Sequence, residues 1–67
     1  MAKPRPNIGD IWQSGRGTLF RKFYWLVMDK YIDKSRNTHM LTLKNLETGT
    51  MLILEAVYVR EKWEYIS

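Results

Sequence analysis

Few residues of this sequence have side chains that could act in catalysis or bind a metal, and they do not form a catalytic set. His39 is the only histidine, and the chain has no cysteine. Nucleophilic catalysis needs a base beside a hydroxyl or thiol, together with an orienting acid, and the spacing around His39 indicates no such group. A zinc site needs about four nitrogen or sulfur ligands, which one histidine cannot supply. We therefore expect no catalytic residue, no metal and no cofactor, and interpret the protein as non-enzymatic.

Two patterns point to ligand binding instead. Gly15-Arg16-Gly17 could hold a phosphate with its backbone amides and guanidinium, but it lacks the following helix and lysine of a P-loop, and a plain turn explains it more simply. Residues 16–32, RGTLFRKFYWLVMDKYI, set basic residues among aromatic ones. Basic side chains contact phosphates and aromatic rings stack on bases, so this segment is also typical of a barrel that binds single-stranded DNA or RNA.

The same segment predicts a β-strand that is apolar on both faces. Successive side chains of a strand point to opposite faces. One face would carry Tyr24, Leu26, Met28 and Ile32, and the other Phe23, Trp25, Val27 and Tyr31. Either the chain wraps both sides of this strand, or one face is kept for a partner. A core this small also needs aromatic residues, and we expect at least three of Phe20, Phe23, Tyr24, Trp25 and Trp12 to be buried.

Composition limits the remaining classes. Sixty-seven residues make one domain, too small for the pocket that most metabolic enzymes need. The net charge is +4, and it arises in the first half: residues 1–34 carry seven basic and three acidic side chains, whereas residues 35–67 carry four of each. The sequence shows neither a membrane-spanning segment nor a secretory signal, so we expect a cytoplasmic protein.

The pattern of apolar residues and turn signals predicts five strands. An extended lead-in at residues 1–7 precedes strands at residues 8–13, 19–32, 39–46 and 50–54. The second is longer than usual, so we expect a bulge or bend within it. Gly49 suits the left-handed position of the hairpin turn at residues 45–50. Residues 56–59 could continue a strand, or residues 59–62 could form a helical or 3₁₀ turn before a last strand at residues 63–66.

These elements predict an all-β fold, a small five-stranded barrel over residues 8–67 with a short 3₁₀ turn before the last strand as an option. Closure would remove the exposed edges of an open sheet. The alternative is a three-stranded meander packed by the C-terminal segment as a short helix. Trp63 and Tyr65 could close the barrel or extend an apolar patch, and we favour closure for Trp63.

The order of elements resembles that of SH3-like small barrels, which place a first strand, a loop, a long bent strand, two hairpin strands, a 3₁₀ turn and a short last strand in that order. Three blocks resemble small uncharacterised proteins of bacteriophages and other mobile elements: residues 9–12 (GDIW), 45–49 (NLETG) and 58–66 (YVREKWEYI). The resemblance implies a fold and a source. It implies no activity, because this fold hosts many functions.

We therefore predict a small binding module, a phage or mobile-element protein that binds a host or phage protein and inhibits or modulates it. The alternative is a barrel that binds single-stranded DNA or RNA, and homodimerisation through one apolar face is a further option. The residues predicted to contact the partner are basic or large aromatic side chains in or near the second strand. They are Arg16, Arg21, Lys22, Trp25, Tyr31, Lys34 and Arg36.

Overall fold

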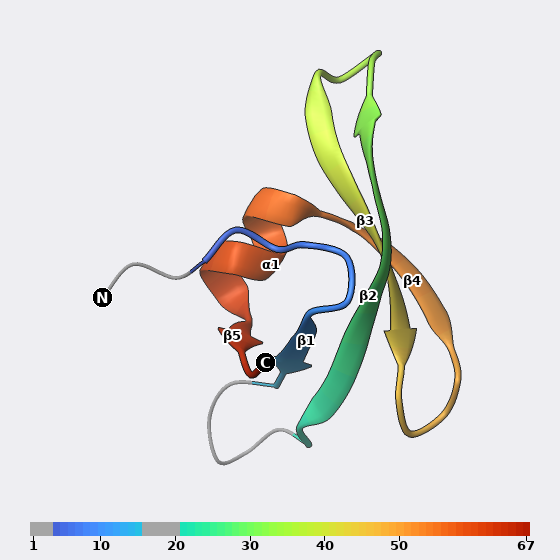
Figure 1. Cartoon of the computed structure of the whole chain (residues 1–67), viewed down its shortest axis with the longest axis vertical. Helices are drawn as coiled ribbons and strands as arrows, with labels where there is room; N and C mark the ends of the chain where they lie inside the picture. Colours follow the sequence, from blue (N-terminus) through green and yellow to red (C-terminus); the bar gives the residue numbers. More distant parts are fainter. Residues whose placement is uncertain (1–3, 16–20) are drawn as a thin grey trace.

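The computed structural model describes residues 4–15 and 21–67. They form an antiparallel sheet of five strands and one short helix (Figure 1). The strands are β1 (Ile11–Ser14), β2 (Phe23–Asp33), β3 (Thr38–Asn45), β4 (Met51–Glu55) and β5 (Glu64–Tyr65), and helix α1 (Ala56–Lys62) connects β4 to β5. The predicted mostly-β character is confirmed. The sheet order is β4-β3-β2-β1-β5, and the sheet is open, with β4 and β5 at its edges.

The first strand is shorter than predicted. Residues 8–10 form a turn rather than the start of the strand, because the amide of Asp10 donates to the carbonyl of Asn7 and Gly9 has a φ of +92°. The side chain of Asp10 closes this turn by accepting the amide of Asn7 at 2.8 Å. β1 therefore begins at Ile11, where pairing with Leu26 of β2 starts.

The bulge predicted in the long strand is confirmed, and it exchanges the two faces of β2. Val27 pairs with Leu43, but the next pair is Asp29 with Thr42, so Met28 is the extra residue. An extra residue shifts the alternation by one position. Beyond the bulge, Lys30 lies on the same face as Val27. The prediction that Tyr31 shares a face with Trp25 is therefore wrong, since Tyr31 pairs with Met40 on the opposite side.

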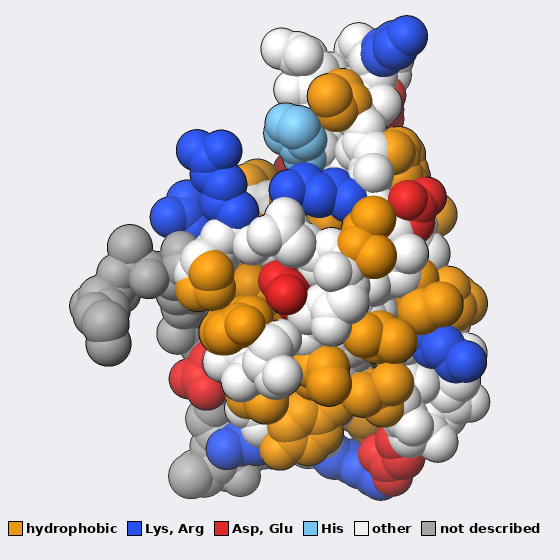
Figure 2. Space-filling view, in the orientation of Figure 1, with side chains coloured by type: hydrophobic (Ala, Val, Ile, Leu, Met, Phe, Trp, Pro, Cys, Tyr) orange, Lys and Arg blue, Asp and Glu red, His pale blue; other side chains and the backbone are white. Residues whose placement is uncertain are grey.

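The hydrophobic core lies between one face of the sheet and helix α1. Seven buried residues form it: Trp12, Trp25, Val27, Leu41, Leu43, Val59 and Trp63. Burying such large side chains on a short chain is the main favourable contribution to folding. Twelve large hydrophobic residues among those described nevertheless remain exposed, and hydrophobic side chains are visible across the face drawn in Figure 2.

The C-terminal segment forms a helix, so the prediction of a helical turn is right and the continued strand is wrong. α1 is longer than the predicted turn and begins at Ala56, a strong helix former. Arg60 and Lys62 lie in its last turn, where cations interact favourably with the helix dipole. Val59 inserts into the core. The buried ring of Trp63 follows, and β5 then pairs with β1 through Tyr65 and Trp12.

The β3–β4 hairpin has the predicted turn. Gly49 has a φ of +79°, in the left-handed region that glycine adopts without strain. Asn45 is buried and holds the turn, because its side-chain oxygen accepts the amides of Glu47 and Thr48 at 2.8 and 3.0 Å. A buried amide side chain with satisfied hydrogen bonds is expected to stabilise one turn conformation.

Candidate functional site

The structure does not bring the predicted contact residues together. Arg21 and Lys22 lie just before β2, whereas Lys34 and Arg36 lie in the turn after it (Figure 1). An extended strand rises about 3.3 Å per residue, so roughly 30 Å separate the two pairs. Arg16 lies outside the described residues. The fold therefore does not form a single basic and aromatic surface along β2.

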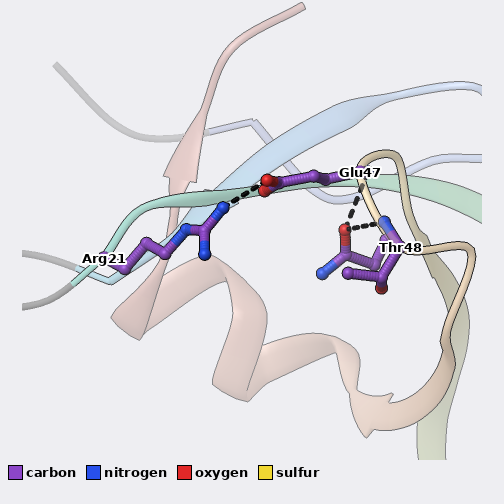
Figure 3. A network of polar contacts seen from close by, with 4 residues as sticks. Arg21, Glu47 and Thr48 are labelled. Atoms are coloured by element: carbon purple, nitrogen blue, oxygen red, sulfur yellow. Dashed lines mark hydrogen bonds and ion pairs between the residues drawn. The ribbon is translucent and has the colours of Figure 1, made fainter.

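Both predicted arginines of the described part form ion pairs within the chain. Arg21 contacts Glu47 in the β3–β4 turn, the same turn that Asn45 holds (Figure 3). Arg36 contacts Glu55 at the end of β4. Exposed pairs of this kind contribute little to stability, about 0–1 kcal/mol. They do place a carboxylate beside each guanidinium, which lowers the attraction of both positions for phosphate.

The turn that carries Lys34 and Arg36 is organised by a carboxylate. Asp33 accepts the hydroxyl of Ser35 at 2.7 Å and its amide at 3.1 Å. These hydrogen bonds favour the ionised form, so the Ser35 hydroxyl first and then the backbone amides lower the pKa of Asp33. Asp33 therefore places an acidic group next to the turn that carries these two cations.

Trp25 cannot serve as a partner contact in this fold. Its side chain is only 8% exposed and belongs to the core. Its ring lies 5.6 Å from that of Trp63, and its Nε1 donates to the hydroxyl of Ser14 at 2.9 Å. The predicted role of Trp25 is therefore corrected to a structural one. Of the five aromatic residues predicted to supply the core, Trp12 and Trp25 are buried, Phe23 is half-buried and Tyr24 is exposed, while Phe20 lies outside the described residues.

Tyr31 is the predicted aromatic contact that the fold leaves accessible. It is 40% exposed on the side of the sheet opposite the core, here called the outer face. Paired residues of adjacent strands share a face, so the register defines the apolar members of this face. They are Ile11, Tyr24, Leu26, Tyr31, Met40, Met51 and Ile53.

A hollow opens at the β4 edge of the outer face, near the β2–β3 turn, where Leu54 from the core side and Tyr58 from α1 also line it. Its volume is about 350 Å³, and its lining includes Met40, Ile53 and Tyr58, together with the ion-paired Arg36 and Glu55. Met40 is 8% exposed, whereas Ile53 and Tyr58 are about half exposed, at 54% and 47%. A flexible methionine that lines a hollow together with two exposed apolar side chains can adapt to a side chain inserted from outside.

Sequence reasoning missed Ile53 and Tyr58 as surface residues. The alternation in Met51-Leu52-Ile53-Leu54 was the available signal, because only Leu52 and Leu54 pack against the core. With apolar residues at all four positions, however, the sequence pattern does not identify the inner pair. Identifying Tyr58 as a surface residue required the position of the helix, which the sequence did not determine.

Comparisons with known protein families, with curated proteins and with solved structures found no match. Within residues 4–15 and 21–67, no group of three or more His, Cys, Asp or Glu residues could hold a metal ion. None of the helical structure in these ranges is long and apolar enough to cross a membrane.

Proposed function

We propose that this chain is a non-enzymatic binding module that covers a surface of a partner protein with the outer face of its sheet. The observation that carries this proposal is the hollow at the β4 edge, which buried Met40 and exposed Ile53 and Tyr58 line, next to the exposed Tyr31 that pairs with Met40. In the setting that the phage resemblance implies, the partner is a host or phage protein in the cytoplasm, and the module inhibits or modulates it.

The outer face has the composition of a binding surface. In a small antiparallel sheet, the face away from the core is normally polar. Here Tyr24, Tyr31, Met51 and Ile53 are each at least 40% exposed on that face. These side chains contribute little to the core, so their burial in a complex would add apolar contact that the free chain lacks. Tyrosine is also enriched among the residues that dominate protein interfaces.

This face carries exposed charges of both signs, Lys44 and Asp29, so a partner would place an acidic group beside Lys44 and away from Asp29. Lys44 is exposed and lies between Leu26 and Met51 in the same cross-strand row. The carboxylates of Glu47 and Glu55 are both paired with arginines. A partner carboxylate that met Lys44 would be surrounded by apolar contacts, where water screens a charge pair least.

The order of elements supports the SH3-like interpretation. A first strand, a long bulged strand, two hairpin strands, a short helical segment and a short last strand follow one another as in those barrels. A small SH3-like domain with a contact surface on one face of its sheet is large enough to block a site on a partner protein.

The test is a pull-down from bacterial lysate with the tagged chain, with and without nuclease, followed by mass spectrometry. We expect a discrete protein that nuclease does not remove. Ile53→Asp should abolish its capture, because the substitution places a charge beside the hollow. Ile32→Asp is the matched control, since Ile32 is 53% exposed against 54% for Ile53 but pairs with His39 on the opposite side of the sheet.

Three outcomes would contradict the proposal. If nuclease abolishes the capture, the chain binds nucleic acid rather than a protein surface. Equal loss of capture in both variants would show that the outer face is not the contact surface. Capture of this chain alone, with a dimer mass in solution that Ile53→Asp converts to a monomer, would replace the foreign partner by a second copy.

A further inference from the structure

A second cavity lies on the side of the sheet that carries the core, and its charge is of one sign. Its volume is about 370 Å³, and four basic side chains line it: Arg5, Lys30, His39 and Arg60. They come from the lead-in, from β2, from β3 and from α1, so the cavity exists only in the folded chain. Figure 2 shows Lys and Arg side chains gathered beside the histidine.

Among the described residues that line this cavity there is no carboxylate, whereas two arginines elsewhere on the sheet form ion pairs. Arg21 and Arg36 each contact a glutamate. Lys30 has a neutral neighbour instead, the side-chain oxygen of Asn7 at 3.5 Å from its Nζ. Asp29 is next to Lys30 in the sequence, but the register places it with Thr42 on the outer face. No carboxylate among the described lining residues offsets the charges of Arg5 and Lys30, and an anion bound between them would reduce their mutual repulsion.

The bulge at Met28 is what directs Lys30 into the cavity. Without the extra residue, Lys30 would follow the alternation of Tyr24 and Leu26 and point to the outer face. With it, Lys30 pairs with Leu41 on the side of the core. Bulges commonly redirect a side chain next to a functional site. The same bulge places Tyr31 on the outer face, so one local irregularity supplies residues to two separate surfaces.

The remaining walls suit an organic group rather than a bare ion. Pro6 and Val57 line the cavity beside the basic residues, and the imidazole of His39 offers a flat surface. Small-ligand pockets have volumes of roughly 300–1,000 Å³, so this cavity has room for more than a single phosphate. Histidine is one of the side chains on which nucleobases stack.

We propose that this cavity binds a nucleoside phosphate, either as a free nucleotide or as one unit of a nucleic-acid strand. Lys30, Arg5 and Arg60 contact the phosphate, and His39, Pro6 and Val57 contact the base or sugar. The site lies across the sheet from the proposed protein-binding face and does not depend on it. It also differs from the aromatic and basic stretch along β2, which the structure divides between the two ends of that strand.

The test is an amide NMR titration of the full chain at neutral pH with inorganic phosphate, AMP and a short single-stranded oligonucleotide. We expect AMP to shift the amides of Lys30, His39 and Val57 and to bind more tightly than inorganic phosphate. Because Lys30→Gln removes a charged hydrogen bond to the phosphate, it should weaken AMP binding about tenfold or more. A stronger response to the oligonucleotide than to AMP would identify a strand as the source of the phosphate, and a weaker response would identify the free nucleotide.

Lys34→Gln is the matched control, because it removes the same charge from an exposed turn outside the cavity and should leave AMP binding within about twofold. Arg5→Gln is the second variant. It lies in the lead-in outside the strands and helix, so it tests the site even if Lys30→Gln disturbs the sheet. The proposal fails if neither AMP nor the oligonucleotide shifts these amides, if inorganic phosphate binds as tightly as AMP, or if all three variants weaken binding equally. Because nuclease-resistant capture of a protein tests the outer face separately, each proposal can fail alone.

Discussion

Replacing Trp25 with alanine is expected to destabilise the protein strongly. The indole is 8% exposed, contacts the ring of Trp63 and donates a hydrogen bond to Ser14. Truncating a buried tryptophan to alanine costs about 3–5 kcal/mol, and the lost ring pair and hydrogen bond lie within or slightly above that range. A domain of this length has a total stability of about 3–10 kcal/mol. The substitution therefore removes a third or more of the stability.

The measurement is urea unfolding followed by far-UV circular dichroism, which does not depend on the fluorescence of the removed ring. Trp25→Phe is the intermediate variant, because it keeps a ring in the core and loses the donor to Ser14, and its unfolding free energy should fall between wild type and Trp25→Ala. A folded Trp25→Ala chain with the midpoint of the wild type would refute the assignment of this ring to the core. Ile53→Asp should leave the midpoint nearly unchanged, which separates loss of binding from loss of fold.

Two further predictions concern the backbone at two glycines and the loss of stability at low pH. Gly15 and Gly49 have φ values of +80° and +79°, but a Cβ on Gly15 would lie 2.4 Å from the carbonyl oxygen of Arg21, whereas one on Gly49 meets nothing within 4 Å. Gly49→Ala should lose about 1–2 kcal/mol from the left-handed backbone alone, and Gly15→Ala should lose more; equal losses in urea would contradict the close approach. Carboxyl NMR should give Asp33 a pKa below 3.8, because the hydrogen bond from the Ser35 hydroxyl stabilises the ionised carboxylate. The contribution of Asp33 to stability is therefore present above its unfolded pKa and is lost as the pH falls through its folded pKa. Ser35→Ala should raise that pKa, and an unchanged value would rule out the hydrogen bond as the cause.

Local signals in the sequence predicted much of the fold. The hairpin at residues 45–50 follows from turn chemistry, since Gly49 accepts a positive φ and Asn45 bonds to the amides that follow it. The length of the second apolar run predicted its bulge. The tail was ambiguous, because a short run of apolar and charged residues suits a strand and a helix equally, and the packing of Val59 against the core decides between them.

The candidate sites were less accessible to sequence reasoning. Trp25 and Tyr31 were both predicted contacts because aromatic residues supply cores and interfaces alike. Only the register shows that the first is buried and the second exposed. The predicted basic residues are close in sequence, yet an extended strand carries them to opposite ends of the sheet.

The sequence by itself determined the strands, their turns and the excess of basic charge, because these depend on residue type and on periodicities a few residues long. The tertiary structure decided which face each side chain occupies, because one extra residue at Met28 inverts the alternation for the rest of β2. It also decided that Arg5, Lys30, His39 and Arg60 line one cavity. No local pattern joins positions so distant in the chain, and only the packing of the lead-in and the helix against the sheet brings them together.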